Sequence, residues 1–197
     1  MPLTLTTAVS ISAATASTGP CIAHIGGYYF STRAMYAYLD STDSWVVTPV
    51  APVTTIVLDP SHNNIAVATG PDGMPHLIYY DYDFTLGTRQ TKYTRLAAGG
   101  WTTPEIIDNN TTSSLALAIA SDGTPRVCYL RPDPAHSGHA QLWYAWRTSD
   151  GTWHNHLVRD SVGYMANRLT MVLDPEDRPH IAYCDYHDWK LYYATAP

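Results

Sequence analysis

The chain has 197 residues, of which 45% are hydrophobic, and this is enough apolar material for a packed core. A disordered or fibrous protein is therefore excluded. The formal net charge is -6, with 17 Asp and Glu against 11 Lys and Arg, so the surface is not basic and we expect no nucleic-acid partner.

The sequence contains no apolar run of about 18 residues, the length that a membrane-spanning helix needs. The N-terminal segment lacks the basic start and the Leu-rich core of a signal peptide. Three cysteines, Cys21, Cys128 and Cys184, cannot all pair with one another, and none has the spacing of a zinc finger or a redox motif. We therefore predict a soluble, cytoplasmic protein with structural thiols and no membrane partner.

The first predicted element is a strand within residues 2–9. Leu3, Leu5 and Thr7 alternate with Thr4 and Thr6, which is the period of a β-strand. This strand precedes the first of four internal repeats, so its place in the fold depends on how the repeats are built.

Each repeat reads as an apolar strand, a tight turn ending in Pro, a second strand, a variable stretch, a third strand with a central Tyr, and a Trp that opens a fourth strand. These features recur at intervals of about 50 residues, the size of one blade of a β-propeller. They are Pro20, Pro75, Pro125 and Pro179; Tyr36, Tyr93, Tyr144 and Tyr193; and Trp45, Trp101 and Trp153.

The strand segments are short and rich in β-branched and aromatic residues, and no segment has a convincing helical period. Turns such as Asp72-Gly73 and Asp122-Gly123 supply residues that tolerate a positive φ angle. We therefore predict an all-β fold: a single four-bladed β-propeller domain over residues 1–197. The expected blades span about residues 10–51, 62–108, 113–160, and 167–197 plus 2–9.

The fourth repeat lacks a Trp-bearing outer strand, because only four residues follow Tyr193. If residues 2–9 pair beside the last strand, the missing strand is restored and the sheet has no open edge. We expect this N-terminal strand to close the ring. The alternative is that the chain is a piece of a longer array of repeats.

Four motifs carry a resemblance to a known class of repeat. They are P-H at residues 75–76, L-W-Y-A at 142–145, S-D-G-T-W at 149–153 and P-H-I-A-Y-C-D at 179–185. The sequence resembles bacterial β-propeller repeat proteins that border on the Asp-box, sialidase-like propellers. The resemblance implies architecture only, because S-D-G-T-W is one residue shorter than an Asp box, so it assigns no catalytic residue.

The loops at one end of the predicted propeller are long and dissimilar, whereas those at the other end are short turns. The long loops comprise residues 25–33, 80–91, 130–140 and 184–189. Binding residues concentrate on such loops because the scaffold fixes their ends. Since their polar residues differ from blade to blade, we expect one asymmetric pocket at this mouth.

The second strands bring His24, Tyr79, Tyr129 and Tyr183 towards the mouth, followed by carboxylates and a further histidine. These groups suit proton transfer, with a histidine (His24, His187, His136 or His139) as base, a tyrosine as acid and an aspartate to orient either. The predicted catalytic residues are His24, Tyr79, Asp81, Tyr183, Asp185 and His187. The predicted ligand-binding residues are Tyr28, Tyr29, Tyr82, Tyr129, Arg131 and Trp189.

The leading hypothesis is a small-molecule enzyme with cofactor-independent acid-base chemistry of the lyase, isomerase or cyclase type. The chain has neither a P-loop nor a dinucleotide fingerprint, so no cofactor is expected. No metal is expected either, because each loop offers at most two converging ligands. A carbohydrate-binding propeller, in which Tyr28, Tyr29, Tyr82 and Trp189 stack on sugars, is the first alternative, and a protein-interaction scaffold is the second. The expected partner is a small molecule or a glycan, and the oligomeric state stays open.

Overall fold

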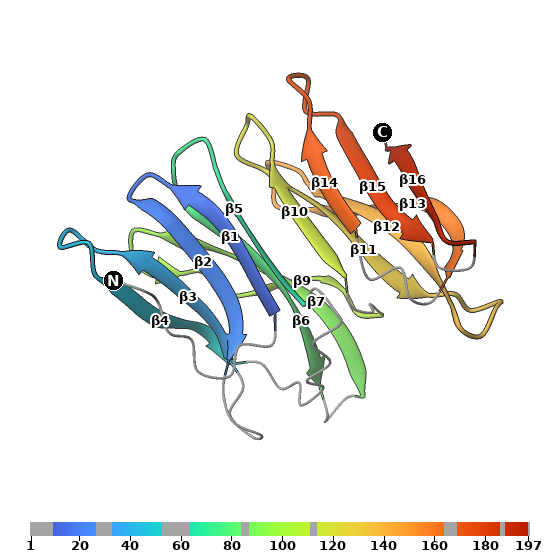
Figure 1. Ribbon diagram of the computed structural model, residues 1–197, viewed down its shortest axis with the longest axis horizontal. Helices are drawn as coiled ribbons and strands as arrows, with labels where there is room; N and C mark the ends of the chain where they lie inside the picture. The colour runs from blue at the N-terminus through green and yellow to red at the C-terminus, as the bar shows by residue number, and fades with distance from the viewer. Residues whose placement is uncertain are drawn as a thin grey trace.

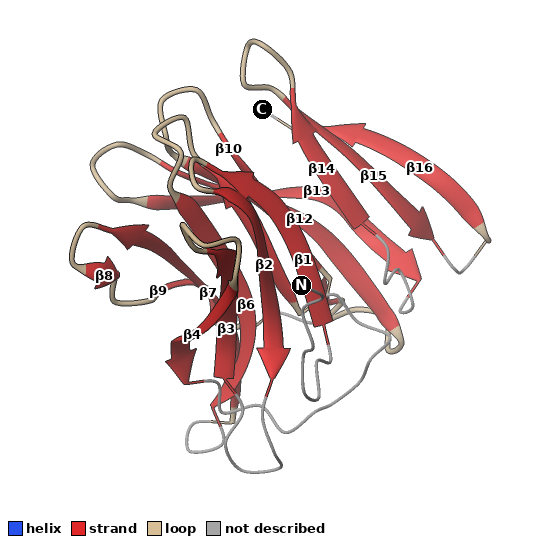
Figure 2. Ribbon diagram, turned by 60° about the vertical axis from the view of Figure 1, so that its left-hand side comes forward, coloured by secondary structure: helices blue, strands red, loops and turns tan. Residues whose placement is uncertain are grey.

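The computed structural model describes residues 10–26, 33–52, 64–83, 87–110, 114–163, 169–185 and 188–196. These residues form strands and turns and no helix (Figure 2). The strands make four antiparallel sheets that lie side by side, from the first blade in blue to the fourth in red (Figure 1). The predicted all-β fold with a four-bladed propeller arrangement is confirmed.

The first two blades follow the predicted order of strands. The first blade comprises β1 (Ser10–Ala16), β2 (Gly19–Gly26), β3 (Arg33–Leu39) and β4 (Trp45–Pro52). The second blade comprises β5 (Ile65–Thr69), β6 (Pro75–Asp83), β7 (Thr88–Ala97), β8 (Gly100–Trp101) and β9 (Glu105–Asp108). Its outer strand is split in two because Pro104 has no N–H to donate to the ladder.

The third and fourth blades repeat the pattern. The third blade comprises β10 (Leu115–Ile119), β11 (Pro125–Pro132), β12 (His139–Arg147) and β13 (Trp153–Gly163). The fourth blade comprises β14 (Leu169–Leu173), β15 (Pro179–Asp185) and β16 (Lys190–Thr195). The predicted closure by residues 2–9 lies outside the described residues, so this closure and the single-domain boundaries stay predictions.

The tight turns form as their residues predict. Gly73 and Gly123 have φ angles of 77° and 82°, a region in which a Cβ is disfavoured. Each glycine N–H donates to the carbonyl three residues earlier, over 2.9 Å to Gly70 and 2.9 Å to Ala120. The repeated prolines Pro75, Pro125 and Pro179 are the first residues of β6, β11 and β15, where a missing N–H costs little.

The core consists of three layers, one between each pair of neighbouring blades. Alternation along a strand decides which layer a side chain joins: Leu77 and Tyr79 face the first blade, and Ile78 faces the third. The layers are also tied by polar contacts between turns, such as the Ser17 N–H donating to the Gly73 carbonyl over 3.0 Å. Ser121 Oγ likewise donates to Asp177 Oδ2 over 2.6 Å, joining the third blade to the fourth.

The repeated Tyr and Trp residues are the two halves of one contact between blades. Tyr36 of the first blade meets Trp101 of the second edge-to-face, with ring centroids 5.3 Å apart. Tyr93 of the second blade meets Trp153 of the third in the same way, at 5.5 Å. Such pairs add about 0.5–1.5 kcal/mol beyond the burial of their area. The period in the sequence therefore reflects a contact that each blade makes with the next.

Candidate functional site

Four predicted site residues occupy equivalent places on the second strands, and all four are buried: His24, Tyr79, Tyr129 and Tyr183. The three tyrosines belong to three different layers, because each ring faces the preceding blade. The structure therefore distributes them among the blades and does not gather them around one pocket. Their predicted catalytic and binding roles stay predictions.

His24 is 4% exposed, and neither ring nitrogen has a hydrogen-bond partner within the described part of the chain. Burial lowers the pKa of His24, so its imidazole is neutral at physiological pH. A neutral imidazole is the form that a general base requires.

Tyr129 lies in a closed polar network between the second and third blades. Its hydroxyl is 2.9 Å from Asp108 Oδ2 and 3.1 Å from Asn155 Oδ1. Arg131 Nε lies 3.5 Å from the same Asp108 oxygen, and the guanidinium covers the Trp143 ring at 4.7 Å. Two of the predicted ligand-binding residues, Tyr129 and Arg131, therefore already bind protein groups.

Tyr79 occupies the equivalent place between the first and second blades, and there the space is open. A pocket of about 450 Å³ lies beside its ring, which we call the Tyr79 pocket. The Tyr79 side chain is 1% exposed, belongs to the core layer between these blades and also lines this pocket. The pocket is lined by Val50, Ala51, Tyr79, Lys92, Trp101, Thr102, Thr103, Pro104 and Ile106.

Lys92 brings a positive charge to the Tyr79 pocket, and Asp81 holds it in place. Lys92 pairs with Tyr79 in the register of β6 and β7, and its Nζ donates to Asp81 Oδ2 over 2.6 Å. The Asp81 side chain is 3% exposed and that of Lys92 is 21% exposed. Two predicted catalytic residues, Tyr79 and Asp81, therefore meet around a lysine that the sequence analysis missed.

A signal for Lys92 was present in the repeat. The residue before the repeated tyrosine is Met35, Trp143 or Tyr192 in the other three blades, and only the second blade has a charged residue there. A lysine in a half-buried position needs a partner, because burial of an unpaired charge is costly. Comparison of equivalent positions would have singled it out.

The remaining predicted residues lie apart from the Tyr79 pocket or outside the description. Asp185 is 6% exposed and accepts the Gly163 N–H over 2.8 Å, which joins the end of β13 to the end of β15. Trp189 is 80% exposed and Tyr82 is half-buried. Tyr28, Tyr29 and His187 lie outside the described residues. Of the four mouth loops, only residues 130–140 are described in full.

The two histidines of that loop bind neighbouring side chains. His136 Nδ1 is 2.8 Å from Asp133 Oδ2, and His139 Nδ1 is 2.9 Å from Ser161 Oγ. Across the described ranges, no three metal-ligating side chains come together. Cys21 and Cys128 are buried free thiols whose pKa is raised by burial, which disfavours the reactive thiolate. Within the same ranges no helix is long and apolar enough to span a membrane.

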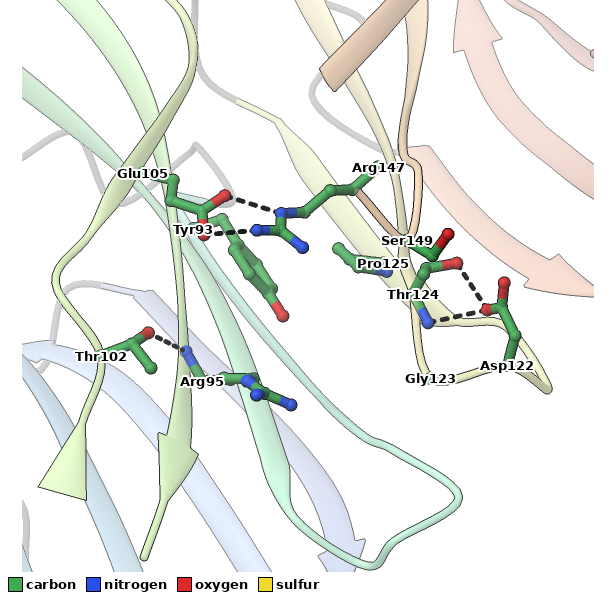
Figure 3. A pocket seen from close by; sticks show the side chains of 10 residues that line it. All are labelled: Tyr93, Arg95, Thr102, Glu105, Asp122, Gly123, Thr124, Pro125, Arg147 and Ser149. Atoms are coloured by element: carbon green, nitrogen blue, oxygen red, sulfur yellow. Dashed lines mark hydrogen bonds and ion pairs between the residues drawn. The ribbon is translucent and has the colours of Figure 1, made fainter. Parts of the chain in front are cut away.

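A second pocket, of about 370 Å³, opens among the short turns between the second and third blades (Figure 3). We call it the Tyr93 pocket. Glu105 accepts two hydrogen bonds from Arg147, over 2.8 and 3.0 Å, across its upper wall. The pocket is lined by Tyr93, Arg95, Thr102, Glu105, Asp122, Gly123, Thr124, Pro125, Arg147 and Ser149.

The Tyr93 hydroxyl lies 2.7 Å from Nδ1 of His76, which is 1% exposed. Burial lowers the pKa of His76 to about 4 and raises that of Tyr93 to about 12. Both groups are therefore neutral at pH 7, and their contact is a neutral hydrogen bond. The sequence analysis selected neither this pair nor the Arg147–Glu105 pair. Arg147 and Glu105 come from different blades, so no pattern within one repeat brings them together.

Glu105→Gln is expected to lower the free energy of unfolding by about 1 kcal/mol, because it weakens a bidentate pair that joins two blades. The Trp153 Nε1–H also donates to Glu105, over 3.0 Å. Denaturant unfolding at low and high salt checks this, with a smaller difference expected at high salt. Glu176→Gln is the control, because its pair with Arg178 is exposed. Equal effects of the two variants would contradict the prediction.

Comparison with known proteins shows that the chain has a fold similar to those of solved structures, but it assigns the chain to no family. No protein-family model matches the sequence, and no curated protein does. An endo-arabinase from Bacteroides thetaiotaomicron matches with a TM-score of 0.52 and 13% identity, over 94% of this chain and 72% of that one. A mutant levansucrase from B. megaterium matches with a TM-score of 0.54 and 10% identity, over 88% of this chain and 61% of that one.

These identities show a shared fold alone. The propeller architecture that the repeat motifs imply is supported, whereas the finer resemblance to Asp-box propellers has no matching family model. The chain spans less than two thirds of the length of the levansucrase.

Proposed function

We propose that the chain binds a small polyhydroxylated molecule, such as a sugar unit, in the Tyr79 pocket. The observation that carries the proposal is the phenol of Tyr79 on the pocket wall, beside an ammonium group held by a buried carboxylate. Asp108 of the second blade and Arg131 of the third close the equivalent space between those two blades, whereas the space between the first and second blades stays open. Open polar groups that converge on a concave wall are typical of ligand sites.

The lining suits a sugar better than an apolar ligand or a multivalent anion. Lys92 has three N–H donors, and its contact with Asp81 uses one of them. Thr103 adds a hydroxyl that both donates and accepts, whereas the Thr102 hydroxyl already accepts the Arg95 N–H over 3.2 Å. Trp101 and Ile106 offer apolar surface for the C–H face of a sugar ring. The volume of about 450 Å³ lies within the usual range for small-molecule sites.

The likeness of fold supports the same class of ligand. The two solved structures are named as an endo-arabinase and a levansucrase, which are names of carbohydrate-active enzymes. Because fold alone does not determine function, the pocket residues carry the proposal and the neighbours agree with it.

Acid-base chemistry without a cofactor, of the lyase, isomerase or cyclase type, is a second candidate for this pocket. Burial and the negative charge of Asp81 raise the pKa of Tyr79, so its phenol is protonated at neutral pH and is able to donate a proton. Product analysis by NMR after incubation with each bound sugar tests this. Recovery of every sugar unchanged would reject the enzyme and leave the binding proposal standing.

Tyr79→Phe is expected to weaken sugar binding about tenfold, because it removes one hydrogen bond to the ligand and leaves the ring in place. Ligand-detected NMR on a panel of monosaccharides and short oligosaccharides, followed by calorimetry, measures the affinity and a stoichiometry of one site per chain.

Tyr129→Phe is the matched control for this measurement. It removes the equivalent hydroxyl in the third blade, where that group binds Asp108, so sugar affinity is expected to be unchanged. Absence of saturable binding by every sugar, or an affinity of Tyr79→Phe equal to that of the wild type, would overturn the proposal.

A further inference from the structure

The blades follow one rule of contact. The face of a blade that carries the repeated tyrosine covers the face of the next blade that carries the repeated tryptophan. Tyr36 meets Trp101, and Tyr93 meets Trp153, with interplanar angles of 74° and 71°. Between the third and fourth blades the same tyrosine face is covered by Met171 and Ile181. Every blade except the last therefore has its tyrosine face buried.

Among the described residues, no other blade covers the tyrosine face of the fourth blade. Tyr193 pairs with Ala182 as Tyr144 pairs with Cys128, and Leu191 pairs with Cys184 as Leu142 pairs with Leu130. Tyr144 and Leu142 are 1% and 0% exposed, whereas Tyr193 and Leu191 are 64% and 73% exposed. Val172 on β14, which lies on the other side of β15, is 62% exposed. A patch of this kind is typical of an interaction surface.

The first blade presents the other half of the contact. Trp45 opens β4 opposite Leu39, as Trp153 opens β13 opposite Arg147. Since the described residues place no blade in front of it, Trp45 has no tyrosine to cover it there. Ile11 and Val47 on the same side of the blade are 53% and 40% exposed.

The two faces are made of residues that complement each other. The fourth-blade face comprises Thr170, Val172, His180, Ala182, Cys184, Leu191, Tyr193 and Thr195. The first-blade face comprises Ile11, Ala13, Ile22, His24, Met35, Ala37, Leu39, Trp45 and Val47, with Arg33 at the start of β3. The fourth-blade face contains no carboxylate, lysine or arginine, and the first-blade face contains one exposed cation, Arg33 at the start of β3, so no charge repulsion between the two faces opposes their contact. Their contact would continue the interface that the blades already form with one another.

One chain does not bring its own two faces together in this structure. The first and fourth blades lie at opposite ends of the row of sheets (Figure 1), and no core layer of the described residues joins them. We infer that two copies of the chain associate head to tail, with the Tyr193 face of each copy against the Trp45 face of the other. A twofold axis then relates two identical contacts, and the eight blades close into one ring, in place of the closure within one chain by residues 2–9 that the sequence analysis predicts.

This arrangement agrees with what is known of propellers and of symmetric assemblies. A head-to-tail contact makes a closed ring when its rotation closes and an open fibre when it does not. Propellers of about four to eight blades are common, so eight blades from two copies lie within that range. The inference does not depend on the proposed sugar site, which lies between the first and second blades of one copy.

Size-exclusion chromatography with light scattering, across a wide range of protein concentrations, is the first test. The expected mass is twice the 21.8 kDa of the chain. Tyr193→Asp and Trp45→Asp are each expected to give single chains, because each places a charge in both contacts of the ring. Leu157→Asp is the matched control: this apolar residue is 36% exposed on the outer strand of the third blade, away from both faces, and the variant is expected to stay paired.

Mixing the two variants tests the head-to-tail geometry directly. The Tyr193→Asp chain keeps an intact Trp45 face and the Trp45→Asp chain keeps an intact Tyr193 face, so a one-to-one mixture is expected to regain paired species through one restored contact. Circular dichroism checks that both variants are folded. We expect the Tyr193→Asp chain to fold, because the Tyr193 side chain is exposed within a single chain. A wild-type mass of 21.8 kDa at all concentrations, or variants that stay single when mixed, would overturn the inference.

Discussion

The free energy of unfolding is expected to fall by about 3 kcal/mol through His76 alone as the pH falls from 6.5 to 4. His76 is 1% exposed, and burial is the largest cause of its lowered pKa, to which Arg95 adds and which Asp72 opposes. In the unfolded chain the imidazole takes up a proton near pH 6.5, whereas in the folded chain it does so only near pH 4. The unfolded state therefore gains protons first, and stability is lost across that window and not above it.

Denaturant unfolding at a series of pH values measures this loss, and His76→Gln isolates it. Glutamine keeps an acceptor for the Tyr93 hydroxyl but does not titrate, so the slope between pH 6.5 and 4 is expected to become shallower. A smaller slope remains because burial also lowers the pKa of His24. His156→Gln is the control, since His156 is an exposed residue of β13 that lies on neither of the two faces. A slope unchanged by His76→Gln would contradict the prediction.

Tyr129→Ala is expected to lower the free energy of unfolding by about 3–5 kcal/mol, the usual cost of truncating a large buried ring. The Tyr129 side chain is 0% exposed and lies in the layer between the second and third blades. Its loss leaves a cavity and also removes a hydroxyl that lies 2.9 Å from the buried Asp108 carboxylate.

The midpoint and slope of denaturant unfolding measure this loss, and an unchanged slope shows that the variant still unfolds from the same folded state. Trp189→Ala serves as the control, because Trp189 is a comparable aromatic residue that is 80% exposed. Its effect is expected to stay within about 0.5 kcal/mol. A loss of less than about 1 kcal/mol for Tyr129→Ala would mean that the two blades hold together without this layer.

Part of the candidate site follows from strand geometry and part does not. The positions of Tyr79 and Asp81 on one strand could be predicted from alternation, because that rule acts along a single segment. Their meeting with Lys92 depends on the register of β6 and β7 across a loop, and the wall made by Val50 and Trp101 depends on two blades packing together. Trp101 was interpreted as an architectural landmark, and the structure shows that it also lines the pocket.

The repeat sequence by itself determined the strands, the turns and the four-bladed arrangement, because alternation, β-branched residues and Asp-Gly turns act over a few neighbouring residues. Only the tertiary structure decided which repeated side chains are covered. Tyr93, Tyr144 and Tyr193 occupy equivalent places in their repeats, yet only the first two are buried, at 3% and 1% exposed against 64%. Burial depends on the blade that lies in front of a residue, and that neighbour comes from a distant part of the chain or, as we infer here, from a second copy.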